Sequence, residues 1–293
     1  MRTAALGKLS WIGALVAAGL IAYVLHLENT LLQITKYEVE CPRLPQAFDG
    51  FRIVLISDLH GNTFGDRQEK LVSAIREFDA DAIAISGDLV DEREFALPPA
   101  ISLLEGIQGL APVYYVCGNH EVATRKLDLI QAQLEDLGAN VLRNQAVPIT
   151  RGESSIAIAG LDDPLALSTS PCGWAARLRE ILSGIREDAP GRFTILLSHR
   201  PELMDVYAAC GVDLVLSGHA HGGLVRLPGV GGLVAPGQGL LPRYTAGLYQ
   251  TGNTRMIVGR GLGNSDKFQV RVFNRPELVL ITLRTSQFSG RKP

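Results

Sequence analysis

An apolar run near the N-terminus is the first marked pattern along the chain. Between Trp11 and Leu27, a stretch of 17 residues, the only strongly polar side chain is His26. At about 1.5 Å per residue, a helix of this length falls slightly short of a ~30 Å hydrocarbon core, and the Leu31-Leu32 pair could extend it. The pattern therefore favours an uncleaved membrane-spanning helix.

Two other interpretations of this run stay open. Arg2 and Lys8 precede it, as the basic residues of a cleaved signal peptide do, although no small-x-small cleavage site follows the run. A buried helix of a soluble protein normally has a polar face, which this stretch lacks. The same two basic residues favour a cytoplasmic N-terminus and an extracytoplasmic catalytic domain, by a weak positive-inside bias.

Three short apolar runs then recur at regular spacing. They cover residues 51–57, 82–86 and 113–117, and they lead to Asp58, Asp88 and Asn119, which lie 30 and 31 residues apart. Stretches with helical spacing lie between them, at 67–78 and about 96–107. These are the lengths of strand-helix-strand units with parallel strands. The carboxyl ends of such strands meet at one sheet edge, where open α/β folds place their sites.

The second half of the chain repeats this arrangement. Apolar runs at 193–198 and 212–217 lead to His199 and to Gly218-His219-Ala220-His221, and a helix is predicted at 173–185. From Leu224 onward, Gly and Pro punctuate short runs at 256–258 and 278–283, which predicts a second sheet of mixed or antiparallel strands. No low-complexity linker separates the halves. A single domain from about residue 35 to 285 is therefore expected.

Charge and cysteine content exclude several classes of protein. Twenty-eight Lys and Arg against 30 Asp and Glu give a net charge of −2, so nucleic acid is not an expected partner, because its binding depends on cations that neutralise phosphates. The cysteines (Cys41, Cys117, Cys172 and Cys210) are too scattered for a disulfide scaffold or a zinc knuckle. Cys117 and Cys210 have apolar neighbours and are expected in the core. No G-x-S-x-G motif is present, which argues against a serine hydrolase.

The positions of the histidines point to metal chemistry. Five of the six follow predicted strands, beside Asp or Asn or beside another His. One such residue is weak evidence of a site, but five together with Asp58, Asp88 and Asn119 supply enough nitrogen and oxygen ligands for two metal ions that share one carboxylate. The sequence therefore predicts a dinuclear metal centre.

These motifs resemble those of the calcineurin-like metallophosphoesterases. The resemblance rests on Asp58-x-His60, Gly87-Asp88, Gly118-Asn119-His120-Glu121, His199 and Gly218-His219-x-His221, which occur in order between about residues 50 and 223. The N-terminal run and the stretch from Gly218 to Pro228 look most like the bacterial membrane-associated branch, which includes phosphodiesterases and UDP-2,3-diacylglucosamine pyrophosphatases. The resemblance implies an α/β fold, a four-layer α-β-β-α sandwich with the metals at the strand ends.

The resemblance also implies a role for each motif residue. Asp58, His60 and His221 would bind one metal ion, Asn119, His199 and His219 the other, and Asp88 both. Oxygen and imidazole ligands suit Mn, Fe or Zn. A hydroxide that bridges the two ions would attack phosphorus. His120 would be the general acid that protonates the leaving oxygen.

Other polar residues carry weaker signals. Asp91 or Glu121 could orient His120, but the simpler expectation is that both are solvated loop charges. A phosphate clamp could come from arginines near the motifs, although an exposed surface arginine is the simpler expectation for each; they are Arg200, Arg226, Arg243 and Arg260. Asn62 and Tyr244 are weak candidates for substrate contact, so the substrate-binding residues stay unknown. The glycine-rich segment 259–263 lacks the P-loop pattern.

The expected function is therefore hydrolysis of phosphodiesters or phosphomonoesters, with lipid-linked esters among the candidate substrates, by an enzyme of the cell (inner) membrane. Residues 1–32 would form a single-pass anchor and residues 33–293 the metallophosphoesterase domain. One alternative is a UDP-2,3-diacylglucosamine pyrophosphatase of lipid A synthesis, although its substrate is expected in the cytoplasmic leaflet. Another is a non-catalytic scaffold of the same fold, which the intact His120 and ligand set argue against.

Overall fold

Two six-stranded sheets form the centre of the molecule. The computed structural model describes residues 2–167, 170–264 and 271–286. The first sheet has the strand order β1 (Gln33–Cys41), β16 (Glu277–Thr285), β2 (Arg52–Ile56), β3 (Ala82–Ser86), β4 (Val113–Val116) and β5 (Asn140–Val141). The second has the order β14 (Gly247–Thr251), β15 (Thr254–Val258), β9 (Leu214–Ser217), β8 (Thr194–Ser198), β7 (Ser154–Leu161) and β6 (Gln145–Arg151).

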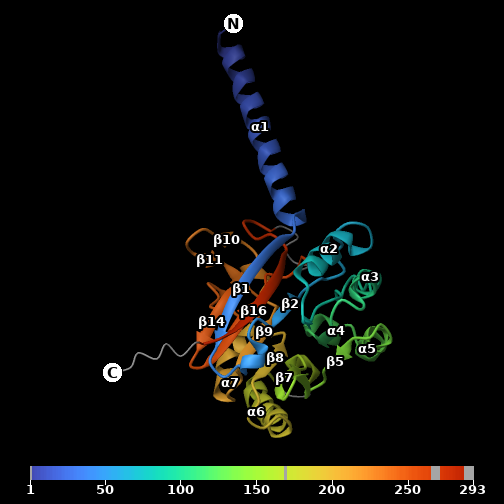
Figure 1. Cartoon of the computed structure of the whole chain (residues 1–293). Coiled ribbons are helices and arrows are strands. Elements are labelled where there is room, and N and C mark those ends of the chain that lie inside the picture. The colour runs from blue at the N-terminus through green and yellow to red at the C-terminus, as the bar shows by residue number, and fades with distance from the viewer. Residues whose placement is uncertain (1, 168–169, 265–270, 287–293) are drawn as a thin grey trace.

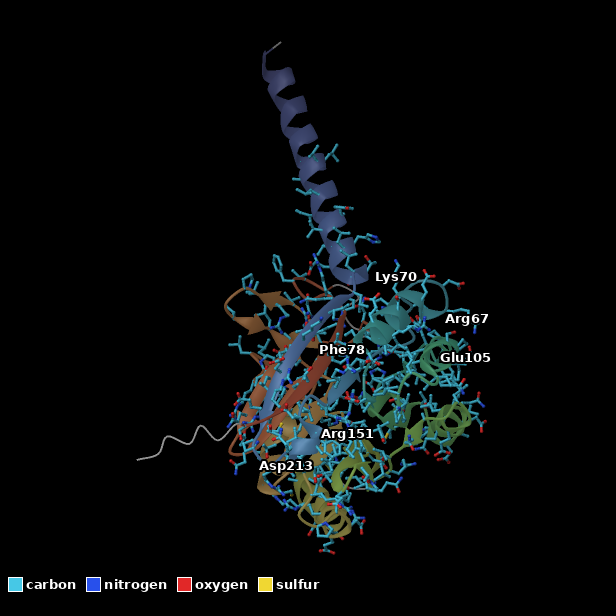
Figure 2. The ribbon with its side chains drawn as sticks, viewed as in Figure 1. Arg67, Lys70, Phe78, Glu105, Arg151 and Asp213 are labelled. Atoms are coloured by element: carbon cyan, nitrogen blue, oxygen red, sulfur yellow. The ribbon has the colours of Figure 1, made fainter. Side chains whose placement is uncertain are left out.

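Helices cover the outer face of each sheet (Figure 1). Apolar residues of α2 (Glu69–Phe78), α3 (Pro98–Ile107) and α5 (Leu127–Asp136) pack on the first sheet. Those of α6 (Pro171–Asp188) and α7 (Met204–Ala209) pack on the second. A third apolar cluster lies between the two sheets. At the surface, Arg67 beside α2 forms an ion pair with Glu105 of α3 at 2.7 Å (Figure 2). The order helix, sheet, sheet, helix is the four-layer sandwich that the sequence predicts.

Burial on both faces explains why the central strands read as continuous apolar runs. In β2, Ile53 and Leu55 point into the space between the sheets, whereas Val54 and Ile56 point toward the helices. Neighbouring strands β2, β3 and β4 are parallel, and so are β7, β8 and β9. Their carboxyl ends therefore deliver the polar motif residues to one edge of each sheet.

The expected C-terminal strands contribute to a second, mixed sheet as predicted, except that the last of them joins the first sheet. The run at 256–258 lies in β15, which pairs in parallel with β9, and β14 extends that sheet. The run at 278–283 lies in β16, which returns to the first sheet between β1 and β2 and is antiparallel to β2. Both faces of β16 are buried, since Val279 and Ile281 contact the inter-sheet core and Leu278 and Leu280 the helical layer. A continuous apolar strand needs two covered faces, which the helical layer and the inter-sheet core provide at this position.

The N-terminal helix α1 (Arg2–Thr30) projects away from this domain (Figure 1). Among the described residues, one helix is long and apolar enough to cross a membrane, over Gly13–Thr30, and only 6% of that window is buried. Figure 2 shows its side chains pointing into open space. This exposure argues against the alternative of a buried helix. Cys41 and Cys117 are buried, as expected for Cys117, whereas Cys210 is only partly buried.

Close approach between the two strand-end loops of the first sheet requires a glycine at position 118. A Cβ atom there would lie 2.2 Å from Asp88 Oδ1, although the φ of −99° suits any residue. Gly118→Ala should therefore lower the free energy of unfolding by roughly 1–3 kcal/mol, the usual cost of overpacking.

Urea denaturation in detergent, followed by circular dichroism, measures this loss. Gly184→Ala is the matched control, because a Cβ at this position of α6 meets nothing within 4 Å. Alanine in a helix interior should leave stability unchanged or raise it by up to ~1 kcal/mol. Equal denaturation midpoints for the two variants would contradict the close packing at position 118.

Candidate metal centre

All seven sequence-predicted ligands gather where the ends of the two sheets meet. Loops of the first sheet supply four of them, and loops after β8 and β9 of the second sheet supply three. In chain order they are Asp58, His60, Asp88, Asn119, His199, His219 and His221. Asp58, Asp88 and His199 are at most 1% exposed. The structure thus brings together side chains from five strand ends, as parallel strand topology predicts.

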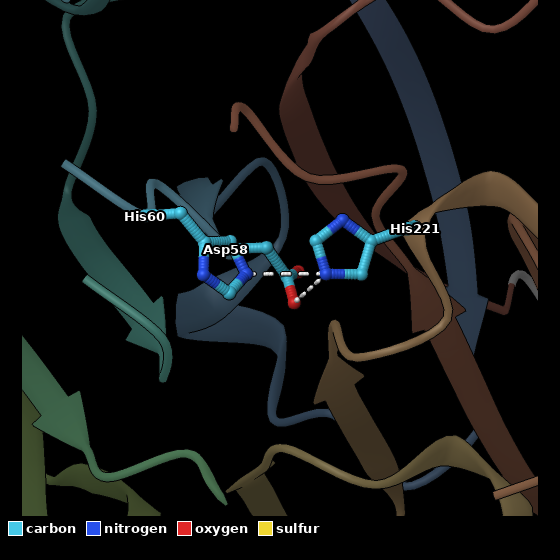
Figure 3. A group of neighbouring side chains, drawn as sticks. All are labelled: Asp58, His60 and His221. Carbon is cyan, nitrogen blue, oxygen red and sulfur yellow. Dashed lines mark hydrogen bonds and ion pairs between the residues drawn. The ribbon is translucent and has the colours of Figure 1, made fainter. Parts of the chain in front are cut away.

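Asp58, His60 and His221 form the first group of converging ligand atoms (Figure 3). The Nε2 atoms of His60 and His221 lie 3.1 Å apart. Asp58 Oδ1 lies 3.5 Å from His221 Nε2. Two imidazole nitrogens and a carboxylate oxygen that point at one another form a donor set typical of a divalent transition metal.

Asp88, His199 and His219 form the second group. Asp88 Oδ2 lies 3.0 Å from His199 Nε2, and His219 Nδ1 lies 3.2 Å from the same nitrogen. The other ring nitrogen of His199 donates a hydrogen bond to the Ser86 carbonyl at 2.6 Å. Because a carbonyl only accepts, Nδ1 carries the proton and the neutral ring keeps its Nε2 lone pair for a ligand bond.

Asp88 lies between the two groups. Its Oδ2 atom is 3.0 Å from His199 Nε2 and 3.8 Å from His60 Nε2. Its other oxygen accepts a hydrogen bond from the His120 backbone N–H at 2.9 Å, which holds the carboxylate in this orientation. The position is the one that a shared carboxylate ligand requires.

Asn119 supplies an independent indication that cations bind here. Its side-chain Oδ1 is buried and has no hydrogen-bond partner among the described residues. Such a polar atom usually costs about 1–3 kcal/mol when it stays unpaired. A metal ion would satisfy an amide oxygen in this position, so the donor set fits two divalent ions.

The backbone of the site is strained. Asp58, His60, Asp88, His219 and His221 have φ values between +46° and +65°. Non-glycine residues in this region cost roughly 1–3 kcal/mol each, and they concentrate at functional sites. Gly218 contributes space, since a Cβ there would lie 2.3 Å from Asp58 Oδ2. The glycines of the Gly-His and Gly-Asn-His motifs thus leave the space that the carboxylates of Asp58 and Asp88 occupy.

Electrostatic coupling links Asp88 and His199. Burial by itself raises the pKa of Asp88, but the charges of His199 and His60 outweigh it and hold that pKa well below its usual range. Burial opposes the charge on His199 as well, yet Asp88 and Asp58 raise the pKa of His199 to about 10. An imidazole must be neutral to bind a metal, so metal binding here displaces a proton.

The expectation that Asp91 is a solvated loop charge is wrong. Its side chain is buried, and Oδ2 lies 3.3 Å from His60 Nδ1 and 3.4 Å from His120 Nδ1. Burial alone would raise the pKa of Asp91, but the hydrogen bond from His60 outweighs it and lowers that pKa. Asp91 therefore orients one predicted ligand and the predicted general acid together.

Glu121 is not a solvated charge either. It is fully buried and accepts hydrogen bonds from the backbone N–H groups of Gly118, Asp88, Leu89 and Val90 at 2.6–3.2 Å. Burial and the nearby Asp88 charge raise the pKa of Glu121 to about 7. The carboxylate joins the loops after β3 and β4. A glutamate three residues after Gly118 matches a helix-capping pattern, which is the signal that could have identified this role.

Of the four candidate arginines, two are buried rather than exposed. Arg200 pairs with Asp163 at 2.7 Å and lies 3.3 Å from His219 Nε2. Arg260 pairs with Glu277 at 2.9 Å. Arg226 is half-buried against the Gly222 carbonyl, and Arg243 is exposed. The buried guanidinium groups therefore already have carboxylate partners.

A cleft of about 290 Å³ opens beside the first ligand group. It is lined by His60, Gly61, Asn62, Asp91, Glu94, Ala96 and Asn264. Asn62 donates a hydrogen bond to the Leu262 carbonyl, which fixes its side chain at the cleft wall. Tyr244 is buried and lies outside this lining. The cleft gives a ligand access to His60 and Asp91.

Known proteins share these features. The model of the calcineurin-like phosphoesterase family matches residues 51–223. The chain is 31% identical to the uncharacterized metallophosphoesterase YkuE of Bacillus subtilis, covering 94% of this chain and 93% of that protein. It is 29% identical to the phosphodiesterase YaeI of Escherichia coli, covering 80% and 82%. A transmembrane protein with a metallophosphoesterase domain from Bos taurus is 32% identical over 76% of this chain and 51% of its own length.

A solved structure supports the fold. The TT1561 protein of Thermus thermophilus aligns with a TM-score of 0.50 at 16% identity, covering 72% of this chain and 90% of that one. The four-layer fold and the metal-dependent phosphohydrolase class expected from the motifs are thus confirmed, and two divalent metal ions are the cofactors of this family. The chain belongs to the calcineurin-like phosphoesterase family.

Proposed function

We propose that the protein hydrolyses phosphodiesters or phosphomonoesters at two divalent metal ions, with His120 as the general acid. The observation that carries this proposal is the position of Asp88, whose Oδ2 atom is within 4 Å of a histidine from each ligand group. Asp58, His60 and His221 would hold one ion, and Asn119, His199 and His219 the other. Mn, Fe or Zn would suit these nitrogen and oxygen donors.

The protein's own residues supply positioning and proton transfer around these ions. When bound, two divalent ions lower the pKa of a water molecule and neutralise charge on the phosphoryl oxygens. Asp91 Oδ2 and the Glu92 backbone nitrogen lie 3.4 and 3.2 Å from His120 Nδ1, so Nε2 is the ring nitrogen that would deliver a proton. From Nε2, His120 would protonate the departing oxygen. The His120 ring packs edge-on against His60, with centroids 4.5 Å apart, which keeps the acid beside the ligands.

We also propose that residues 1–32 anchor the protein in the cell (inner) membrane and that residues 33–293 form its catalytic domain. Two observations support the anchor, namely the exposure of the apolar helix α1 and the relatives named as transmembrane proteins. Arg2 and Lys8 lie at the start of that helix, and their charge favours a domain on the extracytoplasmic side. Residues 1, 168–169, 265–270 and 287–293 of this division lie outside the described part of the chain.

Assay of the purified full-length protein tests the reaction and its alternative. The substrates are p-nitrophenyl phosphate, bis(p-nitrophenyl) phosphate and UDP-2,3-diacylglucosamine, each with added Mn²⁺ and after chelation. We expect metal-dependent release of p-nitrophenolate from at least one ester. Exclusive turnover of the UDP-lipid would favour the pyrophosphatase alternative. Full activity after exhaustive chelation would overturn the proposed function.

Substitution of Asp88 should affect both metal ions. Asp88→Asn removes a charge that faces both groups, so we expect both ions to be lost or weakened. His60→Ala removes a ligand from the first group alone and should chiefly loosen one ion. Elemental analysis of the dialysed proteins measures the number of ions per chain. Two ions in the unaltered protein, with unequal losses in the variants, is the expected result, and one ion in the unaltered protein would contradict the shared site.

Loss of the general acid should depend on the leaving group. His120→Ala should keep its metals and lose roughly 10²–10⁴-fold in kcat for esters with poor leaving groups. The loss should shrink for p-nitrophenolate, which departs with little need of a proton. Steady-state rates for a series of phenyl esters measure this dependence. A loss of equal size across the series would assign His120 to phosphate positioning instead.

A further inference from the structure

Five large apolar side chains form an exposed patch beside the metal centre. Leu227 and Val230 lie on the hairpin of β10 (Arg226–Leu227) and β11 (Gly231–Gly232). Leu240 and Leu241 lie at the end of the next hairpin, β12 (Val234–Ala235) and β13 (Gly239–Leu240), and are 80% and 73% exposed. Phe273 is 57% exposed. We refer to these five residues as the apolar rim.

Hydrogen bonds connect the apolar rim into one unit. Leu241 donates its backbone N–H to Leu233, and Leu233 donates to Val225. Val225 in turn forms a β-bridge with Val272, the neighbour of Phe273. Backbone contacts therefore join the two hairpins and the segment around Phe273 to one another.

The hairpin of β10 and β11 lies near the base of the apolar helix (Figure 1). Glu28 of α1 accepts the backbone N–H of Asn274 at 3.0 Å and forms an ion pair with Arg275 at 2.8 Å. Asn29 exchanges two hydrogen bonds with the backbone of Arg271. These contacts lie immediately after the apolar run that ends at Leu27. The segment of the apolar rim that carries Phe273 is thus held at the level where α1 would leave a membrane.

The composition of the apolar rim suits a lipid headgroup region. From Leu214 to Ser265 the chain contains no Asp or Glu, whereas Arg226 and Arg243 lie within the hairpin segment. Arg243 is exposed and lies over the Tyr244 ring, with its guanidinium carbon 4.9 Å from the ring centroid. Basic and aromatic side chains next to apolar ones are typical of surfaces that dip into anionic bilayers.

Two residues of the apolar rim have a strained backbone that exposure to water does not explain. Leu241 and Phe273 have φ values of +51° and +49°. This region is unfavourable for bulky residues and is a marker of functional sites. Both residues also carry a large exposed apolar side chain.

The cleft beside the first ligand group also lies near the end of α1. Asn264 lines the cleft and contacts Asn29 at the end of α1, with Nδ2 3.4 Å from Asn29 Oδ1. At the other end of the site, Gly237 of the β12–β13 turn lies close to Glu202 and His219. Segments that reach the apolar rim therefore border the metal centre on two sides.

We infer that the apolar rim is a second membrane contact, which inserts into the headgroup region of the bilayer that α1 spans. This inference rests on the proposed anchor, and its partner is a bilayer that contains anionic lipid. The contact would hold the cleft against the membrane surface and raise the effective concentration of phosphoesters carried by lipids.

Fluorescence quenching in vesicles tests the contact without reference to activity. Full-length protein with Trp11→Phe and Trp174→Phe is reconstituted into phosphatidylcholine–phosphatidylglycerol vesicles with brominated acyl chains. L241W is compared with L129W, because Leu129 is also exposed (52%) but belongs to α5, which lies on the side of the domain away from the base of α1 (Figure 1). We expect strong quenching of L241W and emission from L129W equal to that in unbrominated vesicles.

Flotation of the same vesicles separates this inference from the anchor. Protein that floats with the vesicles while L241W and L129W are equally unquenched would overturn the membrane contact and leave the anchor in place. Folded protein that does not float would overturn both. Unquenched L241W in a dimer would assign the apolar rim to a second copy of the chain.

A paired substitution measures the functional consequence. Leu240→Asp with Leu241→Asp should lower hydrolysis of a vesicle-borne phosphoester several-fold and leave hydrolysis of p-nitrophenyl phosphate unchanged. Leu129→Asp is the control and should change neither rate. Equal vesicle rates for the paired variant and the control would contradict a contribution of the apolar rim to substrate access.

Discussion

Contact between the carboxylates of the first sheet and the imidazoles of the second is the interaction on which the site depends. Asp58 accepts the His219 backbone N–H at 2.9 Å, and Asp88 lies 3.0 Å from His199 Nε2. Neither sheet alone carries a complete ligand group. The sandwich therefore has to form before the metal centre exists, and bound metal ions would in turn join the two sheets at their polar edge.

Concentrated negative charge is the difficulty that this arrangement creates. Asp58, Asp88, Asp91 and Glu121 are all buried within a few residues of the predicted ligands. Burial raises the pKa of Asp58, and the Asp88 charge adds to it despite His199. An unpaired buried charge costs several kcal/mol, so each carboxylate needs a compensating partner. Glu121 accepts hydrogen bonds from four backbone N–H groups, and Asp91 lies against the rings of two histidines. Divalent ions would compensate the charges of Asp58 and Asp88.

The sequence places the candidate ligands at strand ends because local patterns determine those positions. Each follows an apolar run whose period and length identify a buried strand, and parallel topology places the strand ends together. The expectation that Asp91 and Glu121 are solvated loop charges is wrong for the opposite reason. Their roles depend on contacts with His60 and with the loop after β3, which lie about thirty residues or more away in the sequence. Adjacent sequence gives no sign of the Asp91 contacts, and for Glu121 the only local sign is its position three residues after Gly118.

Strand pairing shows the same limit. The run in β16 identifies a strand, but its place between β1 and β2 depends on which sheet can bury both of its faces. Strands β6 and β7 went unpredicted, although β7 is buried along most of its length. The burial of Arg200 and Arg260 likewise follows from their carboxylate partners, Asp163 and Glu277, which lie 37 and 17 residues away. Partners at such separations are fixed by the assembled sheets and not by local periodicity.

The apolar helix is connected to the candidate metal centre by hydrogen bonds as well as by the chain itself. Only Leu31 and Leu32 separate α1 from β1. Asn274, which donates its backbone N–H to Glu28, also donates its side-chain amide to the carbonyl of the predicted ligand His221 at 2.8 Å. Any tilt of the helix therefore acts on the segment that supports His221. A membrane that fixes this helix would also fix the orientation of the ligand loop, so the proposed anchor and the candidate metal centre share one set of contacts.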